Sequence, residues 1–260
     1  MILPAYKSPD GRVTLYHGDA LMVLEQLHGF DVIIADPPYG ETNLRWDRWP
    51  RGWPMAVLKL APSMWCFGTL RMFMDHALDF SEWQLAQDLI WEKQNGTNSA
   101  VDRFRRVHEQ IAHFYRGPWN EIYRNPLFTQ DATKKQVRRK ARPLQWGEIG
   151  AASFVSHDGG PRRMRSVLHE RNCHGRAIHP TQKPLGVLAA LLEYSCPPSG
   201  TVLDLFGGSF NAGVAALRLG LSYVGVEADD EHFAAGRQNI EAEIAAKRLD
   251  FSSKSATEVA

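Results

Sequence analysis

The chain has 260 residues, of which 44% are hydrophobic, 10% aromatic and 23% charged, and its formal net charge is +1. This composition is that of an ordinary globular protein and excludes a disordered or fibrous chain. The longest apolar run, residues 187–192, is too short to cross a membrane, and the N-terminus has no apolar signal core, so we expect a cytoplasmic protein. Cys66, Cys173 and Cys196 are too widely spaced for a disulfide framework or a paired-cysteine metal motif, so we expect reduced thiols.

Hydrophobic periodicity predicts strands and helices in alternation. From the N-terminus, strands are expected at residues 12–17, 30–35, 63–68, 84–92 and 107–116, and helices at residues 20–27, 51–60 and 70–78. After residue 176, helices are expected at residues 184–194, 211–219 and 231–249, and strands at residues 201–205 and 222–227. Such alternation is typical of an α/β protein with a mostly parallel sheet.

Residues 117–176 differ from the rest of the chain. Regular periodicity fades there, and the segment carries 12 Lys/Arg against 5 Asp/Glu, a net charge of +7. Aromatic residues such as Trp146 and Phe154 lie among the cations, a mixture that suits contact with phosphates and occasional stacking on bases. The cations that we expect to contact nucleic acid are Lys134, Lys135, Arg138, Arg139, Lys140, Arg142, Arg162 and Arg163. An isolated run of charge is at least as often a solvated loop, so other motifs have to decide.

A glycine turn follows the strand expected at residues 201–205. Gly207 and Gly208 would let a ligand approach the backbone closely. Glu227 stands 19 residues after Gly208, where a carboxylate can accept both hydroxyls of a ribose. The turn lacks both the GxGxxG pattern and the lysine of a phosphate-binding loop, which favours a nucleoside without phosphates. Alone, such a turn is more often a tight strand-to-helix connection.

The sequence Asp36-Pro37-Pro38-Tyr39 is a stronger signal, because two consecutive prolines end the preceding strand and make the turn rigid. A rigid turn at the carboxyl end of a strand places a carboxylate, a carbonyl and an aromatic ring in the ligand crevice of the sheet. A planar base with an exocyclic amino group could donate its two N–H bonds to Asp36 and the Pro37 carbonyl, and stack on Tyr39. Alone, this motif would more often be a structural turn.

Together, these motifs resemble those of the amino-group DNA methyltransferases that use S-adenosylmethionine. The resemblance rests on His17-Gly-Asp19, Asp36-Pro-Pro-Tyr-Gly, His179-Pro-Thr-Gln-Lys-Pro184 and Asp204-Leu-Phe-Gly-Gly-Ser-Phe, in that order. The segments 89–95 and 108–116 also match the family. The order of the motifs resembles that of the β class, in which the catalytic motif comes first and the cofactor motif last. The resemblance covers about residues 12–116 and 176–245.

The resemblance implies a three-layer α/β sandwich of the permuted Rossmann-like methyltransferase type with an inserted recognition module. Residues 1–116 would form the catalytic half, residues 117–176 the DNA target-recognition module and residues 177–250 the cofactor-binding half. The polar residues 251–260 would form a flexible tail. Double-stranded DNA is the implied partner, and a second copy of the chain and a companion restriction endonuclease are further candidates.

The resemblance also assigns residues to roles. The flipped target base would lie against Asp36, Pro37, Pro38 and Tyr39. S-adenosylmethionine would be held by Asp19, Thr181, Lys183, Asp204, Phe206, Gly207, Gly208, Ser209 and Glu227. One residue departs from the family pattern Phe-x-Gly-x-Gly, because Phe210 stands where the second glycine is expected. Its ring either narrows the methionine end of the pocket, or the adjacent Gly207 lets the loop take another path.

The implied activity is site-specific methylation of DNA at N6 of adenine. Cytosine N4 is the alternative, because the same pocket chemistry serves either amino group; Asp rather than Ser at position 36 favours adenine. The substitution at Phe210 leaves open a third reading, a catalytically silent DNA-binding protein with the same fold.

Two further groups of residues have open roles. Four possible metal ligands lack the spacing of a zinc finger, and methyl transfer needs no metal, so we expect none: these are His169, Cys173, His174 and His179. Three tryptophans could flank the DNA or cover the sheet edge, and the second is slightly favoured: these are Trp46, Trp49 and Trp53.

Overall fold

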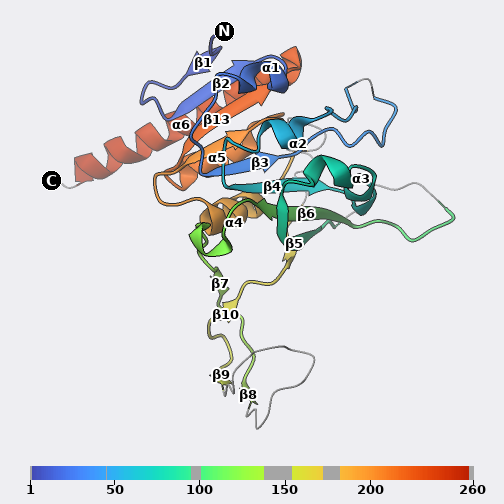
Figure 1. Cartoon of the computed structure of the whole chain (residues 1–260). Helices are drawn as coiled ribbons and strands as arrows, with labels where there is room; N and C mark the ends of the chain where they lie inside the picture. The colour runs from blue at the N-terminus through green and yellow to red at the C-terminus, as the bar shows by residue number, and fades with distance from the viewer. Residues whose placement is uncertain (1, 45, 95–100, 138–153, 172–181, 258–260) are drawn as a thin grey trace. The chain divides into compact units, whose positions relative to one another are not determined.

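A computed structural model of the chain is shown in Figure 1. It describes residues 2–44, 46–94, 101–137, 154–171 and 182–257. The chain divides into two compact units, a larger one formed by Met1–Asn125 with Ser166–Ala260 and a smaller one formed by Pro126–Arg165.

The larger unit is built on a sheet that has nine strands in the described part of the chain. In spatial order these are β1 (Tyr6–Lys7), β2 (Val13–His17), β13 (Ser222–Glu227), β12 (Thr201–Asp204), β3 (Val32–Ala35), β4 (Ser63–Gly68), β6 (His108–Tyr115), β5 (Gln84–Glu92) and β11 (Val167–His169). The five strands from β2 to β4 are parallel, and β6 is antiparallel to both of its neighbours. The mostly parallel sheet predicted from the sequence is confirmed.

Both faces of the sheet are buried, because successive residues of its central strands point to opposite sides. In β3, Val32 and Ile34 belong to one hydrophobic core, and Ile33 and Ala35 to the other. This two-sided burial explains why the strand reads as a continuous apolar run instead of an alternating pattern.

Helices cover each face and complete three layers (Figure 1). One core contains residues of α4 (Leu185–Ser195), α5 (Asn211–Arg218) and α6 (Asp230–Thr257). The other contains residues of α1 (Ala20–Leu24), α2 (Trp53–Ala56), α3 (Leu70–Asp75) and the 3-10 helix η1 (Ala77–Phe80), and a second 3-10 helix is η2 (Trp119–Glu121). The predicted three-layer α/β sandwich is therefore confirmed. No helix in the described ranges is long and apolar enough to cross a membrane.

Helix lengths differ from the prediction where local backbone chemistry intervenes. The helix expected at residues 51–60 is only the four-residue α2. Gly52 adopts a left-handed φ of 76° before it, and from Leu58 onward bonds to the third residue back replace the helical bonds. Conversely, α6 continues to Thr257 where a frayed tail is expected from residue 251. No Gly or Pro follows Gly236 to end this helix.

The strand order places a crevice above the middle of the sheet. From β12 the chain continues through α5 to β13, whereas from β3 it continues through α2 to β4 on the opposite side. Adjacent connections that leave in opposite directions open a crevice at the carboxyl ends of the strands, the usual ligand site of such sheets. The loops after β3 and β12 meet at this switch point.

In its described residues, the smaller unit contains two antiparallel strand pairs. These are β7 (Phe128–Thr129) with β10 (Arg162–Arg163), and β8 (Lys135–Val137) with β9 (Phe154–Ser156). The unit lies within the segment 117–176 but is shorter, because β11 pairs with β5 and so belongs to the large sheet. The compact unit holds 9 of the 12 Lys/Arg and 3 of the 5 Asp/Glu of the segment, so it carries most of the basic excess.

Candidate active site

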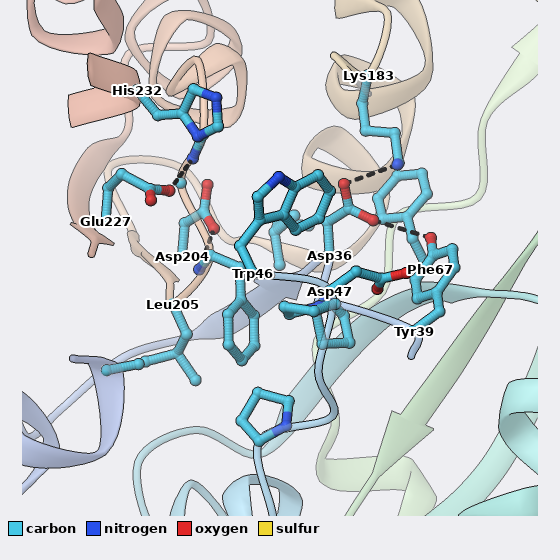
Figure 2. Close-up of a pocket in the computed structure, with 18 of the residues that line it drawn as sticks. Asp36, Tyr39, Trp46, Asp47, Phe67, Lys183, Asp204, Leu205, Glu227 and His232 are labelled. Atoms are coloured by element: carbon cyan, nitrogen blue, oxygen red, sulfur yellow. Dashed lines mark hydrogen bonds and ion pairs between the residues drawn. The ribbon is translucent and has the colours of Figure 1, made fainter. Parts of the chain in front are cut away.

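A cavity of about 1000 Å³ lies at the carboxyl ends of the central strands (Figure 2). Loops that follow four parallel strands line it, namely those after β2, β3, β12 and β13. Among the lining residues are Asp19, Asp36, Pro37, Pro38, Tyr39, Lys183, Asp204, Phe206, Gly207, Gly208, Ser209 and Glu227. The fold thus brings together all the predicted catalytic and cofactor residues except Thr181, which lies outside the described residues.

The catalytic turn is held from the loop that follows it. The prolines end β3 after Ala35, and Gly40 adopts a left-handed φ of 72°. The Asp47 carboxylate then accepts hydrogen bonds from the backbone N–H of Gly40 at 2.8 Å and of Thr42 at 2.7 Å. These contacts make the turn a rigid platform at the cavity wall.

The hydroxyl of Tyr39 lies between two carboxylates. It is 2.6 Å from Glu109 Oε1 and 2.9 Å from Asp36 Oδ1, and its single proton can be donated to either. Burial, followed by the charges of Asp36 and Glu109, raises the pKa of Tyr39 well above its ordinary value, so the phenol stays protonated. Tyr39 therefore orients Asp36 through its hydroxyl, a contact that the expected base-stacking role does not include.

Lys183 forms ion pairs with both carboxylates. Its Nζ lies 2.7 Å from Asp36 Oδ2 and 2.9 Å from Glu109 Oε1, and Lys93 Nζ lies 2.5 Å from Glu109 Oε2 (Figure 2 labels Lys183, Asp36 and Tyr39). The side chains of Lys183 and Glu109 are only 7% and 6% exposed. The result is a buried, charge-balanced chain of two acids and two bases.

The pKa values follow from this arrangement. Burial raises the pKa of Asp36 above its ordinary value, and the Lys183 ammonium opposes that rise. Burial also disfavours the ionised form of Glu109, but the ammonium groups of Lys183 and Lys93 outweigh it and lower the pKa to about 2. Glu109 is thus a fixed negative charge, whereas the protonation of Asp36 is sensitive to its neighbours.

The cofactor side of the cavity is formed by the glycine turn and two acids. Asp204 ends β12, where its carboxylate accepts hydrogen bonds from the Phe206 N–H at 3.1 Å and the Tyr223 hydroxyl at 2.8 Å. Burial raises the pKa of Asp204 to about 7. Glu227 Oε2 accepts the Gly208 N–H at 2.7 Å. Both acids therefore shape the turn as well as line the cavity.

Phe210 takes the second of the two conformations considered from the sequence. Its φ is 51° and its side chain is fully buried, packed edge-on against Tyr223 and Phe233 at ring-centre distances of 6.2 and 5.9 Å. A Cβ on Gly207 would overlap the Phe210 ring, so the glycine makes room for it. The ring lies in the core and is not among the residues that line the cavity.

Two predicted cofactor residues, Asp19 and Lys183, line the cavity and also stabilise neighbouring helices. Asp19 caps the N-terminus of α1 by accepting the Leu21 and Met22 N–H groups at 2.8 and 3.4 Å. The backbone carbonyl of Lys183 accepts the Asn211 side-chain N–H at 2.9 Å, which ties the segment before α4 to α5. Lys183 thus lies on the catalytic side of the cavity, in contact with Asp36.

Glu109 and Lys93 were not among the predicted site residues. Glu109 lies near the start of β6 and Lys93 directly follows β5, so the antiparallel pairing of these strands brings them together. Two features of the sequence could have indicated Glu109. Segment 108–116 matches the family, and an acid stands there in an otherwise buried strand.

The three tryptophans differ in burial, and two of them cover the sheet. Trp53 is fully buried and Trp49 stacks on His76 at a ring-centre distance of 4.0 Å, so both cover the sheet. Trp46 is 41% exposed and lines the cavity (Figure 2). All three line the cavity, and Trp46 is the most exposed of them.

All eight predicted DNA contacts belong to the smaller unit, and four of them are among its described residues. Lys134, Lys135 and Arg163 are exposed, whereas Arg162 is half-buried and pairs with Asp131. The remaining predicted contacts lie outside the described residues: Arg138, Arg139, Lys140 and Arg142. Cys173, His174 and His179 are also outside them, and the described part holds no group of three or more His, Cys, Asp or Glu placed to bind a metal ion.

Comparison with known proteins agrees with this geometry. The family model described as DNA methylase, N6_N4_Mtase, matches residues 30–238. DNA adenine methyltransferase YhdJ of Escherichia coli (strain K12) is 25% identical over 251 residues, covering 88% of this chain and 82% of the relative.

Two solved structures show the same fold. The M1.HpyAVI–SAM complex has a TM-score of 0.58 at 21% identity, covering 87% of this chain and 99% of the other. The PvuII DNA methyltransferase (cytosine-N4-specific) has a TM-score of 0.59 at 18% identity, covering 90% and 87%. Because the family model spans most of the chain, the protein belongs to the N6_N4_Mtase family of DNA methylases and is a DNA amino-methyltransferase of the N6-adenine or N4-cytosine type.

Proposed function

We propose that the protein transfers a methyl group from S-adenosylmethionine to N6 of a flipped-out adenine within a specific DNA sequence. The observation that carries this proposal is the shared cavity: Asp36 and Tyr39 line one side, and Gly208 and Glu227 line the other. A group that could bind a base and a group that could bind a nucleoside thus line one cavity, as methyl transfer between two ligands requires.

The lining of the cavity fits S-adenosylmethionine. Glu227 uses one lone pair of each carboxylate oxygen on the N–H groups of Gly208 and Asp229, which leaves lone pairs for two ribose hydroxyls. The glycine turn carries no Lys or Arg that could bind phosphates. The acids beside it, Asp204 and Glu227, suit a ligand with a positively charged sulfonium. We therefore assign Phe206, Gly208, Ser209 and Glu227 to the cofactor; Asp19, Asp204, Gly207 and Thr181 remain predictions from the resemblance.

The target amino group needs activation, because its lone pair is delocalised into the ring. Asp36 and the Pro37 carbonyl would accept its two N–H bonds, favour a pyramidal nitrogen and stabilise the positive charge that develops there. S-adenosylmethionine, when bound, supplies a methyl group whose bond to sulfur breaks as the bond to nitrogen forms. Asp36 is then the nearest base for the proton that the nitrogen loses.

Adenine is favoured over cytosine by Asp at position 36, since Ser is commoner there among the resembling cytosine-N4 enzymes. YhdJ, by its name an adenine enzyme, adds support, whereas the PvuII enzyme shows that the fold also serves cytosine. The silent DNA-binding alternative loses its basis, because Phe210 is buried in the core and leaves the cavity open.

The choice of base is decided by the methylated product. DNA from cells that express the protein should contain N6-methyladenine at one short sequence, measured by nucleoside mass spectrometry and by sequencing that detects modified bases. DNA from cells that express the Asp36→Ala variant is the control and should lack it. N4-methylcytosine in its place would establish the cytosine alternative and refute the adenine assignment.

We infer that the smaller unit supplies DNA affinity. Replacing Lys134, Lys135 and Arg163 together by Gln should lower the slope of log affinity against log salt. The expected decrease is up to about 0.9 for each phosphate of duplex DNA that the variant no longer neutralises. Binding titrations at several salt concentrations measure this slope.

Lys59, an exposed lysine of the larger unit, provides the matched control, and Lys59→Gln should leave the slope unchanged. Equal slopes for the triple variant and the unaltered protein would contradict the inference, and would place the DNA on another surface. Cytoplasmic location, self-association and a companion endonuclease stay predictions.

A further inference from the structure

The charged groups around Asp36 have an arrangement that binding of the cofactor does not require. Lys183 contacts Asp36 at 2.7 Å and Glu109 at 2.9 Å, and Lys93 contacts Glu109 at 2.5 Å. The Lys183 ammonium also lies 5.1 Å from the ring centre of Phe67. A flexible lysine side chain is thereby fixed at one point, against a single oxygen of Asp36.

We propose that Lys183 is a positioning residue for the methyl-transfer step, which holds the Asp36 carboxylate ionised and correctly oriented and is itself held in place by Glu109. This inference rests on the proposed function, because it gives Lys183 a task in activating the target amino group. It replaces the cofactor-binding role that the sequence resemblance implies for Lys183.

The lone pairs of Asp36 permit this task. A carboxylate has about four acceptor positions. Lys183 takes one on Oδ2 and the Tyr39 hydroxyl takes one on Oδ1, so positions remain for the amino group of the base. These two contacts on different oxygens also prevent the carboxylate from rotating. A fixed carboxylate is needed if it is to accept one N–H bond of the base.

The remaining charged groups near Asp36 make Lys183 necessary. Burial, Glu109 and the nearby Asp204 all disfavour a negative charge on Asp36. Cys66 of β4 is a buried thiol whose pKa is raised by burial, so it adds no charge. Lys183 is the ammonium that contacts Asp36, whereas Lys93 contacts Glu109. Without Lys183, the Asp36 carboxylate would take up a proton at a higher pH and would no longer accept the N–H bond.

The test is the pH profile of kcat/KM for the full-length protein on its DNA substrate. Lys183→Met should move the acidic limb upward by about 1 to 3 pH units, because a close opposite charge shifts a carboxyl pKa by that amount. By calorimetric titration, the Kd for S-adenosylmethionine should stay within about threefold. An unmoved limb, or a Kd that rises tenfold or more, would overturn the proposal.

Lys93→Met is the matched control, because it removes a positive charge that contacts Glu109 but not Asp36. Its limb should move less than that of Lys183→Met, and an equal movement would show that contact with Asp36 is unimportant. In Glu109→Gln, two effects on the acidic limb have opposite signs. Loss of the Glu109 charge alone would move the limb to lower pH, whereas loss of the group that holds Lys183 should move it to higher pH. A limb at lower pH would refute the role of Glu109.

Thermal unfolding shows whether each variant is folded. Should Lys183→Met fail to fold, Lys183→Arg retains the charge: its limb should stay near that of the unaltered protein while kcat falls, because the guanidinium presents its donors differently. An unchanged kcat with weaker cofactor binding would refute the proposal. Activity of the unaltered protein is measured in the same assay, so its absence would count against the proposed function and not against the role of Lys183.

Discussion

Replacing Asp36 by alanine is expected to lower kcat/KM for DNA methylation at least a hundredfold, while the Kd for S-adenosylmethionine stays within a few fold. Asp36 acts on the target amino group, and loss of one charged hydrogen-bond partner in the transition state costs about 3 kcal/mol or more. The cofactor instead rests on the glycine turn and Glu227, at the other side of the cavity. Methyl transfer to DNA and calorimetric titration measure the two quantities separately.

Two variants serve as controls for this result. Asp36→Asn keeps the shape of the side chain but removes its charge, and should be impaired nearly as strongly. Asp88→Ala removes an exposed carboxylate of β5 and should leave both quantities unchanged. An Asp36→Ala variant that retained full activity would remove Asp36 from the mechanism.

The elements that the sequence predicts well are those whose burial is complete and whose ends carry clear signals. Strands were expected at residues 63–68 and 222–227, and β4 and β13 have these bounds. Each is a buried run next to a turn, so periodicity and turn chemistry agree. Short helices such as α2 were predicted too long, because their ends depend on a single glycine conformation and not on periodicity.

Most of the predicted site residues come together because they follow parallel strands. Whatever the register, the carboxyl ends of such strands meet at one edge of the sheet, so Asp36 and Glu227 had to approach one cavity. Glu109 could not be placed in this way. Its position depends on β6 running antiparallel between β4 and β5, a feature that local sequence patterns do not report.

The partners of Lys183 were missed for a related reason. Its motif identified the segment before α4 but not the direction of the side chain, which is decided by two carboxylates from distant parts of the chain. A buried ion pair is specified by the tertiary fold, because each charge is tolerable only once the other is in place.

The second large effect is expected at Phe210, where Phe210→Gly should destabilise the protein by about 1 to 4 kcal/mol. Loss of a buried aromatic ring costs about 3 to 5 kcal/mol. Glycine recovers about 1 to 2 kcal/mol of this, because φ at this position is 51°, a left-handed value that a residue with a Cβ adopts only with strain. Denaturant unfolding measures the difference.

The cofactor should bind more weakly to Phe210→Gly, because the variant loses the ring that lies next to Gly207 and gains backbone freedom in the same turn. Phe210→Ala is the matched variant, since it removes the ring but keeps the strain, and it should be less stable than Phe210→Gly by about 1 to 2 kcal/mol. Tighter binding of S-adenosylmethionine by a fully stable Phe210→Gly protein would mean that the ring obstructs the pocket. The buried, edge-on packing of Phe210 against Tyr223 and Phe233 supports the opposite outcome.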